Sequence, residues 1–254
     1  MNALRQWMAQ GHLSRWASRP TSVILAFALI GLLFSLAVLD RVFPVENSRI
    51  ADRSVIVTSA KGTLLRAFTS SDGRWRLPVK PSEVDSRYIK MLLAWEDQRF
   101  REHAGVDPFA MLRSLYQLAA HARVVSGAST ITMQVARLME PRERTLFAKT
   151  MQVARALQLD WHYSKEEVLE HYLTLAPYGG NLEGIRAASF AWFGKEPARL
   201  TIGEAALLVC LPQSPERRRP DRFPEIARKA RDRVIITLAE RGVITAQEAK
   251  DAME

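Results

Sequence analysis

The sequence predicts a mainly α-helical domain that follows one membrane-spanning helix, with a small β-rich segment between the two. Three observations lead to this prediction. An uncharged apolar run lies near the start of the chain, a short stretch with strand character follows it, and S/T-x-x-E capping boxes precede apolar-periodic runs further on. At 254 residues, the chain is long enough for one such domain with a buried core.

The apolar run extends from Thr21 to Leu39 and contains no charged residue. Its length is close to the roughly 20 residues that span a bilayer, and no small-x-small cleavage site follows it. Arg5, Arg15 and Arg19 precede it without any acidic residue, so the positive-inside rule predicts a cytoplasmic tail over 1–20 and an uncleaved anchor over 21–40. A buried core helix is the alternative, but such a helix normally has a polar face.

Residues 41–80 have the character of a small β-rich linker region. Ser54 to Thr58 and Thr63 to Phe68 are rich in strand-forming residues, and the four residues between them suit a hairpin turn. Ser71 to Gly73 indicates a second turn before the run R-W-R-L-P-V.

Residues 81–254 are predicted to form the helical domain. The capping boxes begin at Ser164, Thr201 and Thr245, where a hydroxyl and a carboxylate satisfy free backbone amides reciprocally. Asp107-Pro108 suits a helix start, and Gly194 suits a helix end.

The chain is strongly basic, with a net charge of +9 and a pI of about 10. Nucleic acid, an anionic membrane surface and a pyrophosphate substrate would all suit this charge. No base-reading module accompanies it, so we expect no nucleic-acid partner. The basic cluster from Arg217 to Arg219 lies in a proline-bounded loop and is expected to be solvated surface.

The cysteine and histidine content predicts no metal site. Cys210 is the one cysteine and lies in an apolar run, which is typical of a small buried hydrophobe. No cluster of His, Cys and carboxylate residues has the spacing of a closed metal site. His103 is a lone histidine next to a turn, and such residues usually satisfy a local hydrogen bond.

Glu96 is the candidate general base. A helix is expected from Tyr88 to Arg99, with an apolar stripe on which Glu96 also falls, formed by Ile89, Leu92, Leu93 and Phe100. A carboxylate on that stripe should be partly desolvated, which suits a base near neutral pH. In the alternative reading, Glu96 and Asp97 lie near the helix end and point to solvent or cap the next segment.

Two further segments could bind an anion. Ser129 and Thr130 lie at a predicted helix start, where free amides and hydroxyls suit an anionic group, although simple helix capping explains them too. Arg144 and Lys149 could neutralise a departing diphosphate, with Gln152 on the same helix face as Lys149. The alternative is a solvated basic helix.

Four motifs together resemble the signature of family 51 glycosyltransferases, the peptidoglycan polymerases at the front of class A penicillin-binding proteins. They are E-D-Q-R-F-R-E-H from Glu96, G-A-S-T-I-T-M-Q from Gly127, R-T-L-F-A-K from Arg144 and Y-L-T-L-A-P-Y-G-G-N from Tyr172. The runs M-Q-V-A-R-L and A-P-Y-G-G resemble the penicillin-binding protein 1C branch. The resemblance is dense from Tyr88 to Pro215.

This resemblance implies a bilobed, lysozyme-like glycosyltransferase domain that polymerises lipid II into β-1,4 glycan strands and releases undecaprenyl diphosphate. Glu96 would take the proton of the acceptor 4-hydroxyl, with inversion at the anomeric carbon. The implied substrate-binding residues are Asp97, Phe100, His103, Ser129, Thr130, Gln134, Arg144, Lys149 and Gln152. Lipid II, the growing glycan chain and the bacterial inner membrane are the implied partners, and other cell-wall synthesis proteins are candidate partners. The domain would be periplasmic.

The chain departs from the family pattern at three positions. Gln152 replaces a glutamate, Met133 replaces a glutamine and Thr174 replaces an asparagine. Loss of the carboxylate at 152 removes a ligand of the kind that Mg²⁺ prefers, so that ion is a candidate cofactor with reduced support. No S-x-x-K occurs, and the chain is expected to lack a transpeptidase. A lysozyme-like glycan hydrolase and a non-catalytic, membrane-anchored glycan-binding remnant remain the alternatives.

Overall fold

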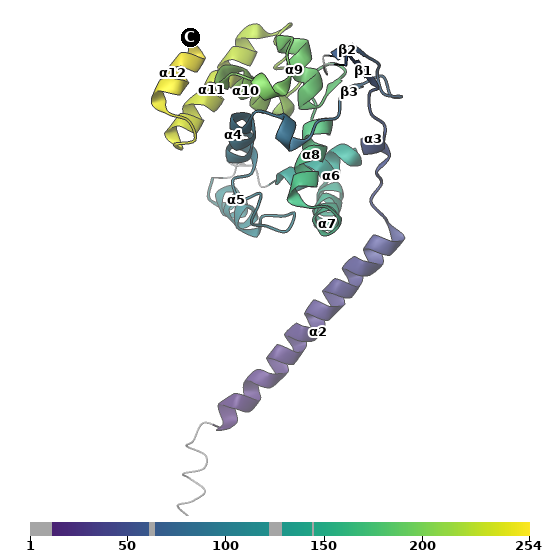
Figure 1. Cartoon of the computed structure of the whole chain (residues 1–254). Helices are drawn as coiled ribbons and strands as arrows, with labels where there is room; N and C mark the ends of the chain where they lie inside the picture. Colours follow the sequence, from purple (N-terminus) through teal and green to yellow (C-terminus); the bar gives the residue numbers. More distant parts are fainter. Residues whose placement is uncertain (1–11, 61–63, 122–128, 144) are drawn as a thin grey trace, which may run out of the picture. The chain divides into compact units, whose positions relative to one another are not determined.

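The computed structural model describes residues 12–60, 64–121, 129–143 and 145–254. The described chain is mainly helical with a few short strands, which confirms the predicted fold class (Figure 1). It divides into two compact units, Met1–Val45 and Glu46–Glu254.

The first unit contains helix α2 (His12–Val42). Within it, Val23–Val42 is long and apolar enough to cross a membrane, with a mean hydropathy of 2.6. The predicted anchor falls on this helix. Large apolar side chains such as Leu25, Phe27 and Phe34 are exposed, as expected for a helix that faces lipid rather than a protein core.

The second unit begins with a short helix and a β segment. Helix α3 (Ser48–Ala51) precedes an antiparallel pair, β1 (Ile56–Thr58) and β2 (Leu64–Ala67), which lies within the predicted hairpin. Strand β3 (Trp75–Arg76) pairs in parallel with β4 (Leu182–Glu183), over one hundred residues later. This pair was not predicted, because strands of two residues have no periodicity to detect.

The β3–β4 pair supplies the two central residues of an ionic cluster, Arg76 and Glu183. The side chain of Arg76 is fully buried. Its guanidinium lies 2.7 Å from Glu183 and 2.7 Å from Asp72, and it donates to the backbone oxygens of Arg49 and Asp52. Arg49 contacts the other Glu183 oxygen at 2.7 Å. Ion pairs of Arg49 and Arg76 with Glu183 therefore hold the start of the second unit against β4.

The rest of the second unit is helical. Its elements are η1 (Pro81–Glu83), α4 (Ser86–Glu96), α5 (Pro108–His121), α6 (Ile131–Met139), α7 (Leu146–His162), α8 (Lys165–Leu175), α9 (Ile185–Phe193), η2 (Pro197–Arg199), α10 (Ile202–Cys210), η3 (Leu211–Gln213), α11 (Pro224–Glu240) and α12 (Ala246–Met253). The capping boxes at Ser164, Thr201 and Thr245 are confirmed, and Gly194 ends α9 with a φ of 66°. This left-handed conformation favours glycine.

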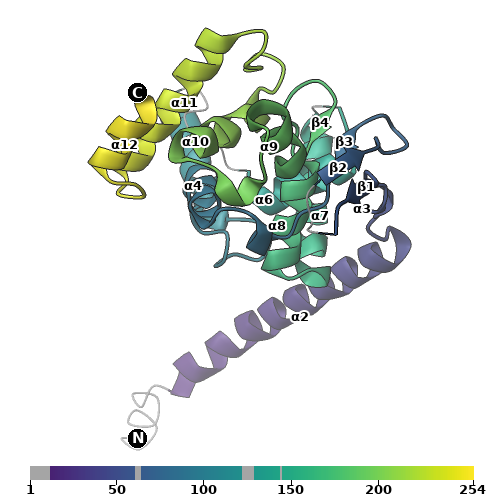
Figure 2. The same ribbon diagram turned by 45° about the horizontal axis from the view of Figure 1, so that its top comes forward.

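The helices pack as two groups. Helix α10 packs on α4, α11 and α12, while α6 packs on α7 and α8. Helix α9 contacts both α8 and α10, and Figures 1 and 2 show it between the two groups. The core residues Leu92 and Leu208 are fully buried in the first group, and Val135 and Leu173 in the second.

The Arg76 cluster should dominate the stability of the β segment. We expect Glu183→Gln to lower the free energy of unfolding by about 3–5 kcal/mol, because it removes the more buried of the two carboxylates that lie 2.7 Å from the buried guanidinium. The matched control is Glu166→Gln, which breaks a pair of the same 2.7 Å length whose two side chains are more than half exposed. Exposed pairs contribute little, so the control should unfold like the parent chain. Equal urea unfolding curves for the two variants would contradict this assignment.

Candidate functional site

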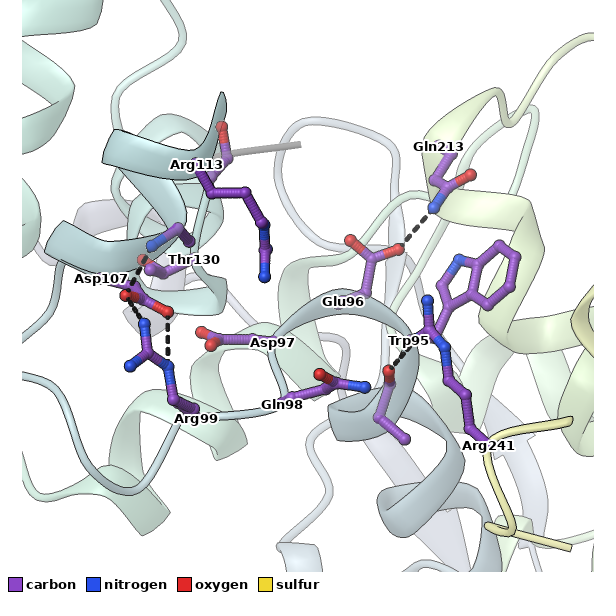
Figure 3. Close-up of a pocket in the computed structure, with 13 residues that line it drawn as sticks. Trp95, Glu96, Asp97, Gln98, Arg99, Asp107, Arg113, Thr130, Gln213 and Arg241 are labelled. Carbon is purple, nitrogen blue, oxygen red and sulfur yellow. Dashed lines mark hydrogen bonds and ion pairs between the residues drawn. The ribbon is translucent and has the colours of Figure 1, made fainter. Parts of the chain in front are cut away.

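A cavity of about 550 Å³ opens beyond the C-terminal end of α4 (Figure 3). Its charged and amide lining comes from four parts of the fold, namely the end of α4 with the turn after it, α5, η3 and the residue that follows α11. The charged residues include Glu96, Asp97, Arg113 and Arg241, and Gln213 is the amide nearest Glu96.

Glu96 is the last residue of α4. The helix ends there because Asp97 adopts φ −160° and ψ 79°, outside the helical region. The predicted helix from Tyr88 to Arg99 is therefore wrong in its last three residues. The predicted stripe is also shifted, because Ile89 and Leu93 are only partly buried. The fully buried residues of α4 are Tyr88, Met91 and Leu92.

Both carboxylate oxygens of Glu96 accept a hydrogen bond from an amide side chain. Gln134 of α6 donates to Oε2 at 2.8 Å, and Gln213 of η3 donates to Oε1 at 2.8 Å. The Glu96 side chain is partly buried and stays next to the cavity. The alternative in which it points freely into solvent is therefore not what the structure shows.

Asp97 caps the next segment, as the alternative reading of this dipeptide proposed. Its Oδ2 accepts from the backbone amide of Ile131 at 2.9 Å, and its carboxylate lies 3.0–3.1 Å from Nε2 of His103. Both side chains are buried, and the ring of Phe100 packs edge-on against His103. Their contacts here are internal, so a direct role of Asp97, Phe100 and His103 in binding substrate stays a prediction.

The N-terminus of α6 is consequently occupied by the protein itself. Thr130 is the N-cap, accepts from the amide of Met133 at 3.1 Å and donates to the backbone oxygen of Gly105 at 2.6 Å. With Asp97 on the amide of Ile131, the expected anion site at this helix start is replaced by an internal carboxylate. The capping alternative for Thr130 is the one that the structure supports.

A second cavity, of about 520 Å³, is linked to the first by one hydrogen bond, between Lys149 of the second and Ser129 of the first. Lys149 of α7 donates from Nζ to Oγ of Ser129 at 2.7 Å and lines the second cavity with Arg137, Arg142 and Gln152. Burial, and then the nearby charge of Arg137, lower the pKa of Lys149. Four basic side chains, Arg137, Arg142, Lys149 and Arg155, line this cavity against two carboxylates, Glu140 and Glu143, so basic groups predominate there. Arg144, the other predicted cation, lies outside the described residues.

Gln152 uses both ends of its amide. Its Nε2 donates to the backbone oxygen of Met133 at 2.5 Å, and its Oε1 accepts from Lys149 at 3.1 Å. A glutamate could not make the first of these bonds. Among the described residues, no three His, Cys, Asp or Glu side chains gather as metal ligands.

A buried tyrosine layer lies near Glu96. The hydroxyls of Tyr88 and Tyr178 are 2.9 Å apart, and both side chains are fully buried together with Tyr172. Burial above all, and to a lesser extent the charge of Glu96, raises the pKa of Tyr178. These hydroxyls therefore stay neutral.

Four residues at these cavities were not predicted from the sequence. Arg137 is three residues after Gln134 and shares its helix face, a spacing that could have identified it. Arg113 extends into the space between Asp97 and Glu96 (Figure 3), and Arg241 donates to the backbone oxygen of Ala94. Gln213 is the last residue of η3, and Arg241 directly follows α11. Both lie more than one hundred residues after their partners in α4, so no local pattern could have indicated them.

Comparison with known proteins gives consistent matches. The family described as Transglycosylase matches residues 61–239. Penicillin-binding protein 1C of Escherichia coli (strain K12) is 46% identical over 85% of this chain and 28% of that protein. Penicillin-binding protein 1F of Bacillus subtilis (strain 168) is 35% identical over 70% of this chain and 25% of that protein. The chain thus spans about a quarter of the length of these curated relatives.

A solved structure of penicillin-binding protein 1A from Haemophilus influenzae also matches. It has a TM-score of 0.45 and 20% sequence identity, over 80% of this chain and 20% of that one.

The charge of Arg137 should be measurable at Lys149. We expect Arg137→Gln to raise the pKa of Lys149, because a like charge that disfavours the ammonium form is removed. The pKa is read by NMR titration of ¹³C-methylated lysines, with Lys149→Arg to assign the signal. Arg142→Gln is the control, since Arg142 lines the same cavity but is paired with Glu140 at 2.9 Å. A larger shift in the control than in Arg137→Gln would overturn the assignment.

Proposed function

This chain belongs to the transglycosylase family, in its penicillin-binding protein 1C type, and we propose that it polymerises lipid II into β-1,4 glycan strands. The observation that carries the proposal is that a carboxylate and a group of basic side chains lie in two neighbouring cavities. Glu96 lies in one cavity, and Lys149 in the second cavity contacts Ser129 of the first. A proton acceptor and a place for a leaving diphosphate are what this transfer requires.

In the proposed reaction, the 4-hydroxyl of the acceptor sugar attacks the anomeric carbon of the lipid-linked donor chain. Glu96 takes the hydroxyl proton as the new carbon–oxygen bond forms. The bond from the anomeric carbon to the diphosphate oxygen breaks, and its electron pair leaves with undecaprenyl diphosphate. Attack from the face opposite the leaving group inverts the anomeric carbon.

The leaving group needs positive charge, because negative charge grows on its bridging oxygen as that bond breaks. Lys149 and Arg137 are the described cations placed for this role. Arg142 and Arg155 line the same cavity, but Glu140 is paired with both. We extend the role to Arg144 from the family resemblance alone.

A two-carboxylate glycan hydrolase fits the first cavity less well. Such enzymes use a pair of carboxyl groups flanking the glycosidic bond. Apart from Glu96, the described carboxylates that line this cavity are Asp97 and Asp107. Asp97 is bound to His103 and to the Ile131 amide, and Asp107 to Arg99 and to the Ala110 amide. Neither is available as the second catalytic group, which favours transfer over hydrolysis.

The site would work at a membrane surface. The candidate span Val23–Val42 supports a single-pass protein of the inner membrane, and the preceding arginines support a cytoplasmic tail and a periplasmic domain. Lipid II and the growing strand would both be held in that membrane by their lipid chains.

Replacing the base should remove turnover and leave the fold intact. We expect Glu96→Gln to lower the rate of lipid II polymerisation by about 10² to 10⁴-fold, since an amide cannot take the acceptor proton. One of the two amide donors would then face the new NH₂ group, so the free energy of unfolding should fall by only about 1 kcal/mol.

The matched control for that experiment is Glu102→Gln, the same chemical change at an exposed carboxylate. It should polymerise like the parent chain. Normal polymer yield from folded Glu96→Gln protein would falsify the role of Glu96 as base. A parent chain that makes no polymer, and instead shortens or only binds preformed glycan, would identify a hydrolase or a glycan-binding remnant.

The proposed topology has its own test. We expect a reporter fused after Glu254 to be active when it is of the kind that works only outside the cytoplasm, because the arginine-only flank should stay inside. A cytoplasm-only reporter at the same position serves as the counterpart. Activity of that second reporter would reverse the proposed orientation.

A further inference from the structure

Gln213 is the feature that neither the motifs nor the proposed chemistry explains. It ends η3, the short helix directly after α10, and contacts Glu96 across 117 positions of sequence at 2.8 Å. Gln134 contacts the other Glu96 oxygen from α6. The carboxylate is thus held from both helix groups, by one amide from each.

Arg218 determines which way the Gln213 amide faces. Its Nη1 donates to Oε1 of Gln213 at 3.2 Å and to the backbone oxygen of Cys210 at 2.5 Å. A guanidinium has donors and no acceptor, so only the oxygen end of the amide can face it. The NH₂ end must then face Glu96. Arg218 lies in the cluster expected to be solvated surface, and these contacts correct that expectation.

We propose that Gln213 and Arg218 are positioning residues that hold Glu96 in its working orientation as the general base. The inference rests on the proposed function, because it assigns them a role only through Glu96. Arg218 ties Gln213 to the end of α10, and Gln213 fixes one carboxylate oxygen. The other oxygen accepts from Gln134, so each oxygen of the carboxylate has one amide partner next to the cavity.

Gln213 donates an N–H to the carboxylate of Glu96. An N–H donor stabilises the charged form of a carboxylate, and removing the donor makes protonation easier. The other charged groups that line the cavity are Asp97, Arg99, Asp107, Arg113 and Arg241. Tyr88, Tyr172 and Tyr178 are the neighbouring titratable groups in the core, and burial raises the pKa of each, so they stay neutral.

The test compares Gln213→Leu, Arg218→Gln and Arg217→Gln in lipid II polymerisation by the full chain. Arg217 is the matched control, because it is the exposed neighbour of Arg218 and no described residue is hydrogen-bonded or ion-paired with it. We expect Gln213→Leu to lower kcat by about 10-fold to 100-fold, the range for one hydrogen bond to a charged group. Arg218→Gln should lower kcat in the same direction by less, and Arg217→Gln should match the parent chain.

The pH profile separates positioning from a general loss of structure. In Gln213→Leu, the acid limb of the kcat/KM profile should move to higher pH, because the base loses a donor to its charged form. A misfolded fraction would lower activity equally at all pH values. An unmoved acid limb in Gln213→Leu, or a loss in Arg217→Gln as large as in Arg218→Gln, would overturn the proposal. Thermal unfolding of each variant confirms that folded protein is compared.

A second readout does not depend on activity. In chain labelled with ¹⁵N-glutamine, the side-chain amide signal of Gln213, assigned with Gln213→Asn, should titrate with pH in the parent chain. The titration should vanish in Glu96→Gln and weaken in Arg218→Gln, but not in Arg217→Gln. If the signal titrates this way while the parent chain makes no polymer, the contact stands and the proposed function fails. A signal that titrates identically in Glu96→Gln would refute the contact itself.

Discussion

The two carboxylates at the end of α4 are the constraint on which the site depends. Glu96 and Asp97 are adjacent, yet both contact α6, one through the side chain of Gln134 and the other through the backbone amide of Ile131. Since α4 packs with α10 and α6 packs with α7 and α8, these two bonds join the helix groups at the site itself. Asp97 joins the end of α4 to the start of α6. Glu96, the residue before it, lies next to the cavity.

Gln152, one of the three departures from the family pattern, has a structural account. Gln152 donates to the backbone oxygen of Met133, so two of the three altered positions meet where α6 passes α7. An amide at 152 satisfies a carbonyl that a carboxylate would repel, and it still accepts from Lys149. The exchange thus removes a charge from the cavity and adds a bond between helices. It is compatible with a working site.

Local signals in the sequence were enough for the helical class, the apolar helix, the three capping boxes and the glycine end of α9, because caps and periodicity depend on neighbouring residues. The motifs singled out Glu96 and Lys149 as candidate site residues, and each of them lines a cavity. The β3–β4 pair, the Gln213 contact and the filled end of α6 could not, because each depends on residues brought together over long separations. The C-terminal boundary of α4 was missed for the same reason, since Asp97 leaves the helix to reach Ile131.

The internal capping of α6 by Asp97 also affects how the substrate is retained. A helix end holds an anion with fixed dipoles close to it, whereas here that end is already neutralised by a carboxylate. In the proposed reaction, the diphosphate would then be held by long cationic side chains such as Arg137, which is exposed. Dissolved ions screen exposed charges strongly and buried ones much less. The affinity for a lipid-linked diphosphate should therefore fall as ionic strength rises. The contact between α4 and α6 should stay the same.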